Sequence, residues 1–189
     1  MRSLLLVLIL AAHVGCISDC RSGLEDYDRF VEICRELATT QVESDGPLAK
    51  VDWMVHPCTA STQEFRKDYK VTYADADYLS FRAEEFCYRG GAHGMTTITV
   101  GTLDRKTGQI LKLDHFVPAN RLTAVEKLLY EGVLKKIGGK DHLQGEVRPI
   151  ENFCIEKDGL HFVYNEYEVA CYACGAIEVV VPLSALDEN

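Results

Sequence analysis

Residues 65–103, FRKDYKVTYADADYLSFRAEEFCYRGGAHGMTTITVGTL, decide the fold of this chain. Aromatic and β-branched residues alternate with polar ones over 65–73, 78–88 and 95–103, which is the period of a strand with one buried face. The turn ADAD separates the first two segments, and the turn GGAHG separates the second from the third. Strands joined by such short turns pair as an antiparallel meander.

Helical patterns lie on both sides of these strands. Residues 24–41 and 121–137 each place apolar side chains at three- and four-residue spacing. Further short strands are predicted at 51–55, 110–113, 152–156, 160–165 and 177–182. The sequence therefore predicts an α+β fold, an antiparallel sheet meander with two main helices packed on one of its faces. A chain of 189 residues has room for one such domain, over residues 17–189.

The N-terminus has the pattern of an export signal. Arg2 supplies a positive charge, and residues 4–12 form an apolar run that is shorter than the roughly 20 residues a membrane span needs. We predict a signal peptide over residues 1–16 and an extracytoplasmic location, either periplasmic, as an outer-membrane lipoprotein, or secreted. Gly15-Cys16 is similar to the end of a bacterial lipobox, although His13 replaces an aliphatic residue there. Lipidation at Cys16, the only membrane association we expect, and plain secretion stay equal alternatives.

The chain has eight cysteines, which in an oxidising compartment are expected to be at least partly paired. Lipidation or removal of Cys16 would leave one thiol over. The spacing selects no pairing, and the disulfide candidates are Cys20, Cys34, Cys58, Cys87, Cys154, Cys171 and Cys174. Cys171 and Cys174 form a C-x-x-C motif that lies between predicted strands and has no second pair at similar spacing. A disulfide is therefore favoured over a redox or zinc site.

The charge balance restricts the class of partner. The formal net charge is −9, and no basic cluster occurs, so we expect no nucleic-acid partner. A cationic protein would be steered towards such a chain, although an acidic excess also serves solubility. The sequence contains no G-x-S-x-G, H-E-x-x-H or phosphate-loop motif. We therefore expect no catalytic residue, metal or cofactor.

Two segments carry candidate ligand-binding residues. Gly90 and Gly91 permit a bare turn that presents His93, which acts either as a contact or only as the cap of a hairpin. Tyr167 and Tyr172 belong to an aromatic segment near the C-terminus, where tyrosines on a loop provide rigid contact area. Packing of these tyrosines in the core is the alternative.

Two longer stretches resemble a known family. The first runs from Tyr78-Leu79-Ser80-Phe81 through the GGAHG turn to Thr107-Gly108-Gln109-Ile110-Leu111, and the second from Asp158-Gly159-Leu160-His161-Phe162 through Tyr167 to the closing VPLSAL. Over residues 50–187 the chain is similar to the extracytoplasmic domain of RsiV-type anti-sigma factors and some peptidoglycan deacetylases, a domain of unknown function. The resemblance implies an α+β fold, a cell-envelope setting and a receptor that captures lysozyme, a cationic muramidase.

We accordingly predict an exported binding domain, not an enzyme, whose ligand is a lysozyme-like muramidase or a cell-wall fragment. Tyr167, Tyr172, Gly90, Gly91 and His93 are the predicted contact residues. Two alternatives stay open. The first is an envelope hydrolase or metal-dependent enzyme that uses His93 with another histidine or a carboxylate. The second is a disulfide-stapled structural domain.

Overall fold

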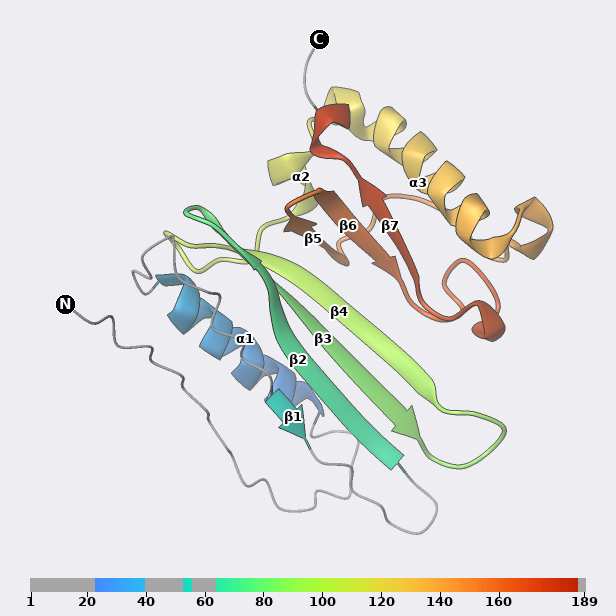
Figure 1. The fold of residues 1–189 in the computed structure, drawn as a ribbon, viewed down its shortest axis with the longest axis horizontal. Helices are drawn as coiled ribbons and strands as arrows, with labels where there is room; N and C mark the ends of the chain where they lie inside the picture. Colours follow the sequence, from blue (N-terminus) through green and yellow to red (C-terminus); the bar gives the residue numbers. More distant parts are fainter. Residues whose placement is uncertain (1–22, 40–52, 56–63, 187–189) are drawn as a thin grey trace.

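The computed structural model describes residues 23–39, 53–55 and 64–186, which form two antiparallel sheets, each with a helix against it (Figure 1). The first sheet has the order β1-β2-β3-β4, with the strands Trp53–Val55, Glu64–Ala74, Tyr78–Tyr88 and Met95–Asp104. The second has the order β5-β6-β7, with the strands Phe153–Glu156, Gly159–Tyr164 and Ile177–Val181. The α+β class predicted from the sequence is confirmed.

Helix α1 (Gly23–Thr39) covers one face of the first sheet. Its buried stripe includes Phe30 and Cys34, and the ring of Phe30 stacks on Tyr69 of β2 with centroids 5.0 Å apart. Phe81 of β3 meets the same Phe30 ring edge-on at 5.7 Å. The alternation predicted for residues 65–103 therefore turns its aromatic face towards this helix.

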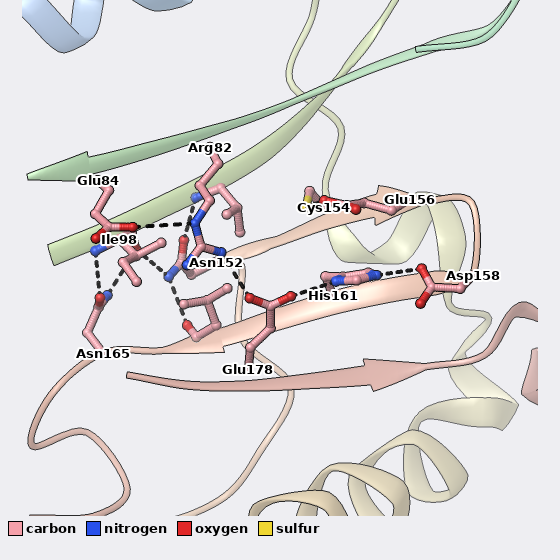
Figure 2. Close-up of polar contacts among 12 residues, drawn as sticks. Arg82, Glu84, Ile98, Asn152, Cys154, Glu156, Asp158, His161, Asn165 and Glu178 are labelled. Carbon is pink, nitrogen blue, oxygen red and sulfur yellow. Dashed lines mark hydrogen bonds and ion pairs between the residues drawn. The ribbon is translucent and has the colours of Figure 1, made fainter. Parts of the chain in front are cut away.

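The second main helix, α3 (Leu122–Ile137), packs against one face of the second sheet. The side chains that fill this core are Val125, Leu129 and Val133 from the helix and Phe153, Leu160, Phe162, Tyr164, Ile177, Val179 and Val181 from the strands. Tyr164 is buried, and its hydroxyl donates to the carbonyl of Arg148 at 2.8 Å. The opposite face of this sheet is more polar and carries Glu156, His161 and Glu178 (Figure 2).

Polar side chains join the two sheets. The Asn152 amide accepts from the backbone N–H of Val100 at 2.9 Å and donates to the carbonyls of Ile98 and Val163 (Figure 2). The Asn165 amide accepts from the N–H of Ile98 at 2.7 Å and donates to the carbonyl of that residue. These two asparagines occupy the open hydrogen-bonding edge of β4 much as a neighbouring strand would. They fix the start and the end of the β5-β6 hairpin against the first sheet.

Two expectations about the sheet need correction. The strands divide into two sheets with separate helices, where the sequence suggested one meander with both helices on one face. Residues 110–113 are not a strand, because Ile110 makes only an isolated bridge to Leu103 and Leu113 begins the short helix α2 (Leu113–Phe116). The N–H of Leu113 donates to the Glu151 carboxylate instead of to a strand.

The predictions for residues 1–22, the signal peptide, Cys16 and Cys20 among them, lie outside the described residues, as does Cys58. Within the described part of the chain, no helix has the length and hydrophobicity that a membrane crossing requires.

Candidate functional site

The turn between β3 and β4 is bare and is held in place at both ends. Gly90 and Gly91 have φ values of 97° and 103°, which favour glycine, and a Cβ on either would meet nothing within 4 Å. The hydroxyl of Tyr88 donates to the carbonyl of Gly91 at 3.0 Å. At Gly94, a Cβ would lie 2.3 Å from the Phe86 ring, so only glycine fits beneath that ring. The turn therefore presents His93 to solvent from a fixed position.

The loop that follows β6 is anchored beside this turn. Asn165 and Glu166 bind the backbone of β4, the latter by accepting from the N–H of Thr96 at 3.3 Å. On the other side the loop binds the chain that follows α3, because the N–H of Gln144 donates to the carbonyl of Val169 at 2.9 Å. Between these anchors, Tyr167 has a φ of 69°, a left-handed conformation that non-glycine residues rarely adopt. Such outliers cluster at active sites, ligand clamps and switch regions.

The turn and the loop meet in a cluster of three aromatic rings, His93, Tyr167 and Tyr172. The imidazole of His93 stacks on Tyr172 with centroids 3.7 Å apart, and its Nε2 lies 3.3 Å from the hydroxyl of Tyr167. The Nδ1 lies 3.0 Å from the carbonyl oxygen of Gly94, so with the proton on Nδ1 the Nε2 accepts from Tyr167. Tyr167 keeps 51% of its surface exposed. We call His93, Tyr167 and Tyr172 the aromatic cluster.

The C-x-x-C motif borders the aromatic cluster, because Tyr172 is one of its inner residues. The short 3₁₀ helix Tyr172–Cys174 brings the Sγ atoms of Cys171 and Cys174 to 3.4 Å, with no disulfide between them. The Cys174 side chain, together with backbone N–H groups of the turn, lowers the pKa of the Cys171 thiol. The same contact raises the pKa of the Cys174 thiol. This pair therefore consists of a better and a poorer nucleophile.

The remaining described cysteines differ from this pair. Burial raises the pKa of Cys34 and Cys154 to about 12, and both carry free thiols inside the protein. Cys87 lies half-buried on β3. Cys34 is buried on the apolar side of α1.

A shallow cleft of about 340 Å³ runs along β4 next to the loop that carries Tyr167. Its walls include Tyr27 of α1, Phe81 of β3, and Asn165 and Glu168 of the loop. Of the described residues that line it, Glu151 and Glu168 are acidic and none is Lys or Arg. The cleft therefore favours a ligand that carries apolar groups and positive charge.

The structure brings together all the residues that the sequence singled out for binding, since Gly90, Gly91 and His93 lie on the turn that meets Tyr167 and Tyr172. Sequence reasoning missed the role of Asn165 and Glu166 in anchoring the loop, although both directly precede Tyr167. It also missed His161, which contacts two carboxylates. Of the described residues, Glu156, Asp158 and His161 gather as potential metal ligands, and His93 is not in that group.

Comparison with known proteins agrees with this architecture. Residues 116–184 match the model of a family described as a protein of unknown function, DUF3298, and residues 38–96 match a family described as deacetylase PdaC. No protein of curated function matches the chain.

Two solved structures are similar to this one. A DUF3298 family member from Bacteroides fragilis NCTC 9343 is 27% identical with a TM-score of 0.56, and the match covers 64% of this chain and 52% of that one. A DUF3298 family protein from Pseudomonas aeruginosa PAO1 is 18% identical with a TM-score of 0.48, over 67% of this chain and 62% of that one. This chain thus spans about half the length of the Bacteroides relative. The family-model match and the Bacteroides relative support a DUF3298-type domain.

Proposed function

We propose that this chain is an extracytoplasmic, cell-wall-related binding domain that captures a cationic muramidase of the lysozyme type through the aromatic cluster. The observation that carries the proposal is the meeting of His93, Tyr167 and Tyr172, which come from two separate segments and expose a strained tyrosine to solvent. Tyrosines with locked positions are the residues that most often anchor protein interfaces, because they bury much area at a small entropy cost.

Charge supports the same kind of partner. The chain has a net charge of −9, and the loop places Glu166 and Glu168 on either side of Tyr167. A net negative charge, with carboxylates next to the contact residues in the chain, steers a cationic protein towards the site. The resemblance to RsiV-type domains and the match to the deacetylase PdaC family both favour a cell-envelope setting for such a partner.

The test is direct binding of the mature protein to lysozymes of the c, g and i types, followed as the salt concentration is raised. We expect binding to at least one type, with an association rate that falls with salt and a dissociation rate that changes little. Tyr167→Ala and Tyr172→Ala are expected to weaken binding by at least tenfold. Leu183→Ala is the matched control, because it removes an exposed apolar side chain at the far end of the second sheet.

Two outcomes would overturn the proposal. One is the absence of binding to all three lysozyme types at micromolar concentrations. The other is binding that the two tyrosine variants leave at the strength of the Leu183→Ala control, which would move the contact surface elsewhere. Circular dichroism of each variant separates a loss of contact from a loss of fold.

A further inference from the structure

A second group of side chains lies on the polar face of the β5-β6-β7 sheet (Figure 2), near the β5-β6 turn and so at the opposite end of β6 from the loop that carries Tyr167. Glu156 ends β5, Asp158 lies in the turn after it, and His161 lies on β6. One donor atom from each of the three lies within 4.8 Å of the other two. We propose that Glu156, Asp158 and His161 bind one divalent transition-metal ion of the zinc class.

The two ring nitrogens of His161 have different environments. Nδ1 lies 2.7 Å from the Glu178 carboxylate, and Nε2 lies 2.7 Å from the Asp158 carboxylate. Glu178 is itself held by Arg82, whose guanidinium nitrogen is 2.9 Å away (Figure 2). A histidine that binds zinc almost always donates its other N–H to a carboxylate, which fixes the ring and makes the free nitrogen a better ligand. Arg82 and Glu178 supply that support behind His161.

The burial of His161 and the exposure of Asp158 also suit a metal site. His161 is 9% exposed, so its ring is locked in place by the sheet. The Asp158 side chain keeps 68% of its surface exposed, which gives an ion a path from solvent and lets this ligand adjust. The donors of a tetrahedral zinc site lie about 3.3 Å apart, given bonds of about 2.0–2.1 Å. Asp158 must therefore move outwards by a fraction of an ångström and Glu156 must turn inwards.

The charges near the site balance a divalent cation. Glu156, Asp158 and Glu178 contribute three negative charges and Arg82 one positive charge. The net charge of these groups is therefore −2 when the imidazole is neutral. Glu84, 3.8 Å from Arg82, adds to this negative charge. Because a metal ion binds only an unprotonated imidazole nitrogen, Nε2 is the ligand atom and Nδ1 keeps its proton towards Glu178.

The ligand types indicate which metal fits. Imidazole with carboxylates suits zinc and its neighbours in the first transition row, whereas magnesium and calcium prefer oxygen ligands alone. Three protein ligands leave the fourth position of a tetrahedral ion to water. No local pattern indicates this site, because Glu156-x-Asp158-x-x-His161 spans a hairpin and matches no zinc-ligand motif.

The experiment is a calorimetric titration of untagged, chelator-stripped protein with zinc chloride at pH 8. We expect one ion per chain with micromolar affinity or better. Asp158→Asn and Glu156→Gln, which change partly exposed side chains and leave the fold intact, are expected to weaken binding by at least tenfold. Glu178→Gln is expected to weaken binding by roughly 10- to 100-fold, as for other groups that orient a ligand histidine. The exposed Asp141→Asn is the matched control and is expected to bind as the unmodified protein does.

In the described part of the chain, the Cys171 and Cys174 pair is the main competing zinc ligand, and Cys171→Ser/Cys174→Ser removes it. Binding that survives in this double variant and is lost on adding Asp158→Asn assigns the ion to the proposed site. Cobalt absorption provides a second readout, since nitrogen and oxygen ligands give no thiolate charge-transfer band. Absence of stoichiometric zinc binding would overturn the inference. So would affinities of Asp158→Asn and Glu156→Gln equal to that of Asp141→Asn.

Discussion

The imidazole of His93 lies nearly parallel to the phenol ring of Tyr172, with ring centroids 3.7 Å apart and planes inclined by 20°. The contact joins a turn of the first sheet to a loop of the second, so it forms only when the two halves of the fold are assembled. The hydroxyl of Tyr167 lies 3.3 Å from the same imidazole. His93 is therefore the residue through which both tyrosines are oriented.

The stack predicts an energetic coupling between His93 and Tyr172. Tyr172→Ala and His93→Ala are each expected to lower the free energy of unfolding by about 0.5–1.5 kcal/mol, the value of an aromatic pair. The double variant is expected to lose less than the sum of the two, because the second change removes a ring that has already lost its partner. Urea unfolding of the four proteins measures the coupling. Simple additivity would show that the stack contributes nothing to stability.

The left-handed backbone of Tyr167 leads us to expect that its replacement by glycine or alanine affects stability and binding differently. Its φ of 69° costs a non-glycine residue about 1–2 kcal/mol relative to glycine. We expect Tyr167→Gly to be more stable than Tyr167→Ala by about 1 kcal/mol, while both lose affinity for the muramidase. Thermal unfolding of the two variants side by side provides the measurement. Equal stability of the two would mean that the loop relaxes its backbone once the phenol ring is gone.

The pKa shifts predict the order in which the described thiols react. The hydrogen bond from Cys174 lowers the pKa of Cys171, whereas burial raises those of Cys34 and Cys154 to about 12. In the reduced protein, iodoacetamide is expected to modify Cys171 before Cys34 and Cys154, with a pH midpoint below the ordinary value of about 8.5. Cys174→Ala is expected to move that midpoint upwards, because it removes the side chain whose hydrogen bond lowers the pKa of Cys171.

Peptide mapping by mass spectrometry at a series of pH values follows each thiol separately. Mild oxidation of the same sample is expected to link Cys171 to Cys174, whose Sγ atoms are already 3.4 Å apart. Modification of Cys34 or Cys154 in the folded protein ahead of Cys171 would contradict this order.

The hydrogen bonds of Asn152 lead us to expect that this residue stabilises the junction between the two sheets. Asn152→Ala removes the Asn152 partner of the Val100 N–H and of the Val163 carbonyl in a buried region, at a cost of about 1–3 kcal/mol for each group. The carbonyl of Ile98 keeps its hydrogen bond from Asn165. We expect a loss of at least 2 kcal/mol in the free energy of unfolding, measured with urea. Asn120→Ala, an exposed asparagine before α3, is the control and is expected to change stability by less than about 0.5 kcal/mol. A similar loss of stability in both variants would show that the hydrogen bonds of Asn152 do not stabilise the junction.

Much of the fold could be predicted from local pattern. The strand at 78–88 was predicted with its observed bounds, because its alternation is regular and both flanking turns are marked by Asp or Gly. The short segment 110–113 was predicted wrongly as a strand, since four apolar-rich residues do not distinguish a strand from the entry to a helix. Division into two sheets could not be predicted, because pairing depends on contacts between residues far apart in the chain, such as Ser80 with Ile155.

The two candidate sites also differ in how clearly the sequence indicates their residues. His93 and the two tyrosines stand out in the sequence, as a histidine among glycines and as tyrosines near turn residues. His161 does not, because it occupies one position in the alternating segment LHFVY of β6. Only the register of β6 and β7, which pairs Val163 with Glu178, shows that His161 and Glu178 share a face. That register is part of the tertiary structure, and no local sequence pattern indicates it.

The asparagine amides along β4 also restrict what this protein can recognise. They already use the N–H of Ile98, the N–H of Val100 and the carbonyl of Ile98, so an extended peptide would have to displace both amides to pair there. Recognition by strand addition, which reads main chain and is tolerant of sequence, is closed along this part of β4. A ligand that reaches the neighbouring aromatic cluster must be selected by the shape and charge of its folded surface.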